Sequence, residues 1–169
     1  MGSVGQYSRY ELAPVRLSER VDFVAKDLNV SKEKAKQYIE EIDKFGIGSW
    51  KDLRDSSIIK EYIQKSPSYK GTIYRGINVT EQVYSTIVNS GTVSMDGITS
   101  WAGDRLSAEQ FTQGEGKRIM FVMKDAKNSA GISHIAPLTT ESEVLVYSKS
   151  KYKITEIEKR SQITYIHIK

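Results

Sequence analysis

The sequence predicts an α+β fold in which the helices come first and the strands follow. Three observations lead to this prediction. Up to about residue 66, apolar residues recur at spacings of three and four, the period of an amphipathic helix. After residue 70, short segments rich in β-branched and aromatic residues follow one another. Helices followed by strands, without regular alternation of the two, favour an α+β protein over a doubly wound α/β protein.

The N-terminal part has the capping and stop signals of several helices. Ser18 can cap a first helix, and Ser31 can cap a second helix that stops at Gly46. A further helix start is indicated at Ser49, and helical spacing then continues to Pro67. We therefore expect a layer of helices before the first strand.

The C-terminal part is expected to contain short strands with two short helices between them. The helices are predicted at about Glu81–Val88 and Ser107–Phe111, each preceded by a Thr or Ser that can cap it. The last strand alternates most clearly, with Ile163, Tyr165 and His167 on one side. The predicted strand segments are TIYRGI, RIMFVMK, EVLVY, YKITEIEK and ITYIHI.

The length of 169 residues suits one domain with a substantial core. We expect a single domain over residues 1–169, with a helical part at 1–70 and a β-rich part at 71–169. Cysteine is absent, and the two histidines, His134 and His167, belong to no metal-binding motif. Disulfides and thiolate chemistry are therefore excluded, and we expect no metal.

The net charge of +4 is spread over segments that mix both signs, such as SKEKAKQYIEEIDK. This pattern is typical of solvated faces, so nucleic-acid binding is disfavoured, although RNA or DNA as an acceptor stays open. No apolar run approaches the roughly 20 residues of a membrane span, and the N-terminus lacks the apolar core of a signal peptide. We expect a monomer without membrane contact in the cytoplasm of a target or host cell, with delivery by a phage particle or a secretion system left open.

An arginine inside an apolar strand is the first candidate for chemistry. Arg75 lies in the segment YRGI, before Gly76. Removing a guanidinium from water without a partner is unfavourable, and its planar fork suits a phosphate or a carboxylate. An internal salt bridge would explain Arg75 equally well.

The segment GITSWAGDRLSAEQF, residues 97–111, is the second candidate. It predicts a strand that ends at Thr99 and Ser100, a turn, and a short helix with Ala108 and Phe111 facing inward. A serine at a strand end can hold a neighbouring carboxylate in one rotamer. A simple strand-turn-helix connection is the alternative interpretation.

Two glutamates at the start of the strand EVLVY are the third candidate. Glu141 and Glu143 are two residues apart, so in an extended chain both carboxylates point to one side. A carboxylate can accept a ribose hydroxyl and stabilise an oxocarbenium-like carbon, as it does in glycoside cleavage. Surface charge is the alternative for this pair.

Taken together and in this order, the three pieces resemble the arginine-serine-glutamate class of mono-ADP-ribosyltransferases. The family pattern Ser-Thr-Ser, five residues, Ala, two residues, Phe is matched by Ser100, Trp101 and Ala102, followed by Ala108 and Phe111. The tail ESEVLVYSKSKYKITEIE is similar to the closing strands of the family. The resemblance covers residues 71–160 and implies a split core of two small, mostly antiparallel sheets with N-terminal helices packed alongside.

The resemblance also implies roles for individual residues. Arg75, with Gly76, matches the part that holds NAD through its phosphates, and Ser100, with Trp101, matches the part that binds NAD and positions the catalytic glutamate. Glu143 matches that catalytic glutamate. Glu141 matches the upstream residue associated with the choice of acceptor.

Two departures from the family pattern stand out. Ala102 replaces the third Ser or Thr of the triplet, so a hydrogen bond from that position is lost. The segment SAGISHIAPLTT, which matches the target-recognition loop, has Pro137 and Leu138 where an aromatic residue is common.

The implied activity is metal-free transfer of ADP-ribose from NAD, the co-substrate, to a protein acceptor with an exposed arginine. Glu143 stabilises the ribosyl cation while nicotinamide leaves, and Glu141 helps to deprotonate the attacking guanidinium, whose pKa is ordinarily above about 12. A glutamate at position 141 goes with arginine as acceptor in the family. The alternatives are an NAD glycohydrolase and a catalytically silent interaction module of a phage particle on the same fold.

Overall fold

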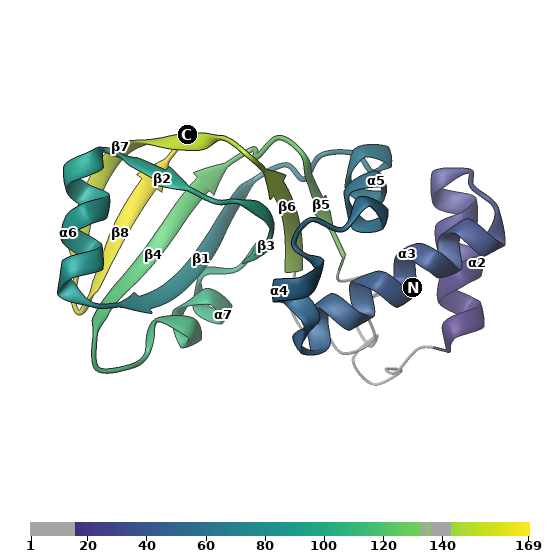
Figure 1. Cartoon of the computed structure of the whole chain (residues 1–169), viewed down its shortest axis with the longest axis horizontal. Helices are drawn as coiled ribbons and strands as arrows, with labels where there is room; N and C mark the ends of the chain where they lie inside the picture. Colours follow the sequence, from purple (N-terminus) through teal and green to yellow (C-terminus); the bar gives the residue numbers. More distant parts are fainter. Residues whose placement is uncertain (1–15, 133–134, 136–142) are drawn as a thin grey trace.

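The computed structural model describes residues 16–132, 135 and 143–169, and it has the predicted order of helices and then strands (Figure 1). The α+β class is therefore confirmed. None of the helices in these residues is long and apolar enough to cross a membrane.

Over the described residues from 16 onward, the helical part contains four α-helices and a π turn. The predicted cap at Ser31 is confirmed, since its hydroxyl accepts a hydrogen bond from the Lys34 amide, at 3.1 Å. The predicted cap at Ser18 is wrong, because helix α2 begins at Leu17 and Arg16 is its N-cap residue. The helical backbone runs past Gly46 and breaks at Gly48, whose φ of 128° is not helical and suits glycine, so the π turn spans a kink between two helices. The elements are α2 (Leu17–Leu28), α3 (Lys32–Lys44), η1 (Phe45–Ser49), α4 (Trp50–Leu53) and α5 (Ser57–Lys65).

The strands in the described part of the chain form one sheet of eight in the order β2-β7-β8-β4-β1-β3-β6-β5. Every pairing is antiparallel except that of β4 with β8. The elements are β1 (Thr72–Val79), α6 (Glu81–Ser90), β2 (Thr92–Ser94), β3 (Gly97–Ala102), α7 (Arg105–Glu109), η2 (Gln110–Thr112), β4 (Lys117–Lys124), β5 (Ser129–Gly131), β6 (Glu143–Ser148), β7 (Lys151–Arg160) and β8 (Ile163–Ile168).

The sheet narrows at its middle to a single residue pair. The strand pairing of β1 with β3 is limited to Tyr74 and Ala102, whereas β1 pairs with β4 along its whole length. The expected two small sheets are therefore two halves of one continuous sheet. One half consists of β2, β7, β8, β4 and β1, and the other of β3, β6 and β5.

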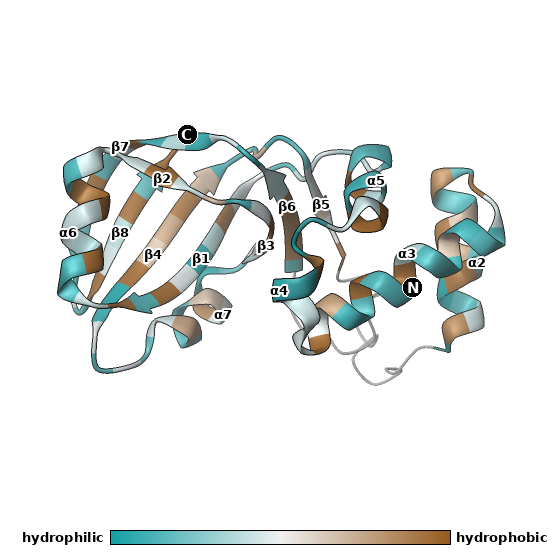
Figure 2. Cartoon of the chain, viewed as in Figure 1, coloured by the Kyte–Doolittle hydropathy of each residue, from teal (hydrophilic) through white to brown (hydrophobic). Residues whose placement is uncertain are grey.

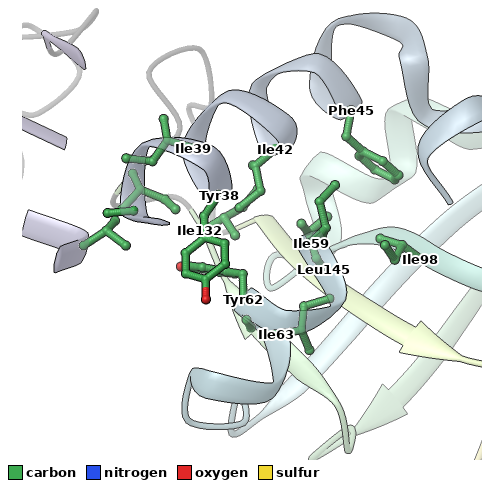
Figure 3. Packing of buried hydrophobic residues seen from close by; sticks show 14 of the residues in the cluster. Tyr38, Ile39, Ile42, Phe45, Ile59, Tyr62, Ile63, Ile98, Ile132 and Leu145 are labelled. Atoms are coloured by element: carbon green, nitrogen blue, oxygen red, sulfur yellow. The ribbon is translucent and has the colours of Figure 1, made fainter. Parts of the chain in front are cut away.

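The helical part packs on the smaller half of the sheet through one apolar cluster (Figure 3). Tyr38 and Ile59 are fully buried in it, and they meet Ile98 of β3 and Leu145 of β6. Figure 2 shows β6 as a largely hydrophobic strand, and burying each such side chain contributes about 1.5–3 kcal/mol. This packing fixes the helices beside β3 and β6, the strands that carry the candidate site residues Ser100 and Glu143.

Candidate active site

Three of the predicted site residues form a continuous chain of hydrogen bonds. The Arg75 Nη1 donates to the backbone oxygen of Ser100, at 2.8 Å. The Ser100 hydroxyl donates to the Glu143 Oε2, at 2.7 Å. Arginine, serine and glutamate from β1, β3 and β6 thus meet at one place, although 25 and 43 positions separate the bonded residues along the chain.

The register of β3 and β6 explains why the serine reaches the glutamate. Ser100 lies opposite Leu145, and Ala102 lies opposite Glu143. Since residues two apart on a strand share a face, Ser100 and Glu143 are diagonal neighbours on one face of the pair. Ala102 lies directly across from Glu143 and contributes only a methyl group, so the carboxylate is held from β3 by the Ser100 hydroxyl.

The surroundings of Arg75 favour an anionic ligand over the internal salt bridge. Burial lowers the pKa of its guanidinium from the ordinary value, and no nearby carboxylate counteracts that shift in the described residues. Its hydrogen bond to the Ser100 carbonyl uses Nη1 alone. A guanidinium has five N–H donors, so Arg75 keeps donors with which it can bind a phosphate.

These three residues open into a pocket of about 550 Å³ between the helical part and the sheet. This volume lies within the range of pockets that bind cofactors and other small molecules. Phe45, Trp50 and Arg54 of the helical part form one side, and Phe111, which follows α7, also lines it. The remaining lining residues are Gly46, Ser94, Met95, Asp96, Ile98 and Thr99.

The helical part lines this pocket with residues such as Trp50 and Arg54, which were not among the predicted site residues. Trp50 is 47% exposed, and Arg54 follows it four residues later. Residues at this spacing share a helix face, which is the signal in the sequence that could have indicated a common function. Their position at the same pocket as Ser100 follows from tertiary packing, and no local pattern in the sequence indicates it.

Gly76 is explained by packing. A side chain there would lie 2.1 Å from the Ala108 carbonyl oxygen and 2.9 Å from the Thr112 side chain. Glycine therefore lets α7 and η2 pack directly on β1, beside Arg75. The expected contact of Gly76 with NAD stays a prediction.

The side chain of Trp101, a residue predicted to contact NAD, lies in the protein core. It is 2% exposed and belongs to the core cluster that contains Ile73 and Val144. Its Nε1 donates to the Thr99 hydroxyl, at 2.9 Å. Trp101 lies between Ser100 and Ala102 in β3, so its side chain points to the opposite face, and only its backbone is left for a ligand.

The second predicted short helix also differs from its prediction in its start, its cap and the side that Phe111 faces. Ala108 is buried as expected, but Phe111 is 71% exposed and does not face inward. The helix begins at Arg105, and Asp104 caps it by accepting from the Ser107 amide, at 3.0 Å. Phe111 is thereby free to line the pocket.

Glu141 lies outside the described residues, as do Pro137, Leu138 and His134. His167 is described, and its Nε2 lies 2.9 Å from Glu158 Oε1, on strands away from the pocket. In the described ranges, no three His, Asp or Glu side chains come close enough together to hold a metal ion.

No protein-family model matches the chain. The bacterial protein "Putative NAD(+)--arginine ADP-ribosyltransferase Vis" of Vibrio splendidus is 28% identical over 116 residues, which are 65% of this chain and 47% of that protein. The chain thus spans about half the length of this curated relative.

Solved structures agree with this match. ADP-ribosyltransferase Vis in complex with agmatine superposes with a TM-score of 0.56 at 21% identity, over 96% of this chain and 89% of that one. The chain has the ADP-ribosyltransferase fold. Exoenzyme S of Pseudomonas aeruginosa, bound to carba-NAD and a 14-3-3 protein, superposes with a TM-score of 0.59 at 11% identity, over 90% of this chain and 80% of that one. The resemblance seen in the sequence is confirmed, and Arg75, Ser100 and Glu143 lie together within an ADP-ribosyltransferase fold.

Proposed function

We propose that this chain is an NAD-dependent mono-ADP-ribosyltransferase that modifies arginine side chains of a protein and releases nicotinamide. The observation that carries the proposal is the hydrogen-bonded chain from Arg75 through Ser100 to Glu143 at the edge of a 550 Å³ pocket. The named activity of the relative Vis and the carba-NAD complex of exoenzyme S support NAD as the co-substrate.

The arrangement suits the cleavage of the bond between ribose and nicotinamide. Arg75 is placed to bind a phosphate, because it is partly buried and retains free donors. Ser100 fixes the rotamer of Glu143, so the carboxylate is already oriented when positive charge develops at the ribose carbon. The carbon–nitrogen bond breaks, its electron pair leaves with neutral nicotinamide, and the cationic carbon is open to attack from its other face.

Arginine is the acceptor that the comparisons support. The relative Vis is named for transfer to arginine, and its complex contains agmatine, which has the guanidinium group of arginine. A guanidinium nitrogen forms the new bond to the ribose carbon and must lose a proton, which Glu141 is proposed to accept. Glu141, a monomeric state, action inside a target or host cell and a phage origin all stay predictions.

The test of the proposed function uses agmatine before any protein acceptor. The purified chain with NAD should release nicotinamide, and addition of agmatine should yield ADP-ribosyl-agmatine, detected by mass spectrometry. Labelled NAD and a cell lysate should then give a protein modified on arginine. Nicotinamide release without any adduct would support the glycohydrolase alternative, and no turnover at all would support the silent interaction module.

NAD binding should depend on Arg75. Charge-assisted hydrogen bonds of this kind contribute roughly 1.5–3 kcal/mol, so Arg75→Ala should weaken binding by about 10-fold to 100-fold. Arg75→Lys keeps the charge but loses the planar fork, and binding should still weaken clearly. Calorimetric titration with NAD measures both, and Arg160→Ala, at an exposed arginine on β7, is the control. Unchanged affinity in Arg75→Ala would leave this arginine with a structural role alone.

A further inference from the structure

Thr112 is a buried residue that directly follows an exposed aromatic one. The exposed fraction of Thr112 is 0%, whereas that of Phe111 is 71%. The two are consecutive in η2, and Thr112 is enclosed by the protein while Phe111 lines the pocket together with Arg75 and Glu143. The position of the Phe111 ring therefore depends on how firmly the backbone at Thr112 is held.

Asn78 and Arg118 hold Thr112 from two neighbouring strands. They lie directly opposite each other in the pairing of β1 with β4. The Asn78 Nδ2 donates to the Thr112 backbone oxygen, at 2.8 Å, and the Arg118 Nε donates to the Thr112 hydroxyl, at 3.0 Å. That hydroxyl in turn donates to the backbone oxygen of Glu109, at 2.7 Å. Two side chains thus fix the carbonyl and the hydroxyl of one residue.

Asn78 also holds the loop that follows Phe111. Its Oδ1 accepts from the Gly116 amide, at 2.9 Å, and its Nδ2 donates to the Gly116 oxygen, at 3.4 Å. A side chain at position 116 would lie 2.7 Å from the Asn78 Oδ1, so glycine is what lets the loop come this close. Both the donor and the acceptor of the Asn78 amide are therefore bonded to the backbone between Thr112 and Gly116.

An aromatic ring on a fixed backbone suits a ligand that carries flat rings. NAD contains two such rings, adenine and nicotinamide, and a base that stacks on an aromatic side chain gains binding free energy. A segment that is already ordered before binding loses less conformational entropy when the ligand arrives. The hydrogen bonds of Asn78 can therefore raise the affinity of the pocket at Phe111 without any contact between Asn78 and the ligand.

We propose that Asn78 is a positioning residue for NAD binding: it holds Thr112 and thereby presents Phe111 to a ring of the dinucleotide. This inference rests on the proposed function. Asn78 is not among the described residues that line the pocket, so it acts through Phe111. Glu143 is held separately, by strand pairing and by Ser100, so the cleavage step does not depend on Asn78.

A double-mutant cycle separates this role from a general effect on stability. The variants are Asn78→Ala, Phe111→Ala and the two combined. Arg118→Met tests the same point from β4, and it replaces Asn78→Ala in the cycle if that variant does not fold. Asn89→Ala, at an exposed asparagine of α6, is the matched control. The measurements are the Kd for NAD by calorimetry, the KM and kcat of nicotinamide release, and the thermal unfolding midpoint.

Phe111→Ala should weaken NAD binding about fivefold or more, the effect of losing one stacked ring. Asn78→Ala should weaken it about threefold or more, with a kcat within about twofold of wild type. In the Phe111→Ala background, Asn78→Ala should leave the affinity within about 1.5-fold, because no ring remains to be positioned. Arg118→Met should show the same dependence on Phe111, and Asn89→Ala should match wild type.

An equal effect of Asn78→Ala with and without Phe111 would overturn the inference, because Asn78 would then act through β1 or through stability alone. Unchanged NAD affinity in Asn78→Ala, or in Phe111→Ala, would overturn it as well. A wild-type chain that neither binds nor turns over NAD would overturn the proposed function itself, and this inference with it.

Discussion

Replacement of Glu143 by glutamine should reduce both nicotinamide release and transfer by at least about 10²–10³-fold, the range found when one electrostatic contact to a transition state is removed. Glutamine has the size of glutamate and can still accept the hydrogen bond that Ser100 donates to Glu143. The side chain therefore stays in place, and the variant lacks only the negative charge that stabilises the ribosyl cation. NAD turnover with and without agmatine is the measurement.

Glu156→Gln is the matched control for this experiment, since it removes an exposed carboxylate from β7, whose residues at this point do not line the pocket. NAD binding by calorimetry should be close to wild type in both variants. If Glu143→Gln turns over NAD at the wild-type rate, the contact between Ser100 and Glu143 is structural and the proposed function is wrong.

Replacement of Glu141 by glutamine should abolish transfer to agmatine while substantial hydrolysis of NAD remains. A guanidinium must lose a proton during the reaction and is almost fully protonated at neutral pH, given a pKa above about 12. Without a carboxylate nearby, its transfer rate should fall by about 10²–10⁴-fold, the typical contribution of a general base. Water needs less help, so hydrolysis at Glu143 continues. The two products are measured in the same reaction.

The two glutamate variants together test the division of roles between the carboxylates. Equal loss of hydrolysis in Glu141→Gln and Glu143→Gln would contradict it, because Glu141 would then take part in NAD cleavage. If neither substitution changes NAD turnover, the two glutamates are only surface charges.

Much of the fold could be predicted from the sequence because its longer strands have a clear period. Segments with several β-branched residues, such as ITYIHI and RIMFVMK, lie within β8 and β4. Strands β2 and β5 were missed, since three residues are too few to establish alternation. The first helix begins before the serine that was expected to cap it, which shows how poorly single polar residues define helix ends.

The sequence predicted those site residues that belong to motifs following one another along the chain. It did not predict the residues that only tertiary packing brings to the site. Arg75, Ser100 and Glu143 were expected to meet and do so. Trp101 was predicted to contact NAD as the middle residue of the family triplet, but neighbours on a strand face opposite sides and its side chain lies in the core. Trp50 reaches the pocket only through the packing of the helices on β3 and β6, which no local pattern encodes.

The single residue pair between β1 and β3 means that a bound ligand can stabilise the contact between the two halves of the sheet. Only the pair Tyr74 and Ala102 links β1 to β3 by strand pairing. Arg75 lies on the β1 side of this pair, and Ser100 and Glu143 lie on the other side. A dinucleotide that contacts Arg75 on one side and Glu143 on the other would cross this pair. A molecule that binds only the folded chain raises the free energy of unfolding. The increase grows with the logarithm of the ligand concentration once that concentration exceeds Kd. The substrate would thus add contacts between the two halves of the sheet. Its release at the end of each cycle would leave β1 and β3 linked by the Tyr74–Ala102 pair and the hydrogen bond from Arg75 to Ser100.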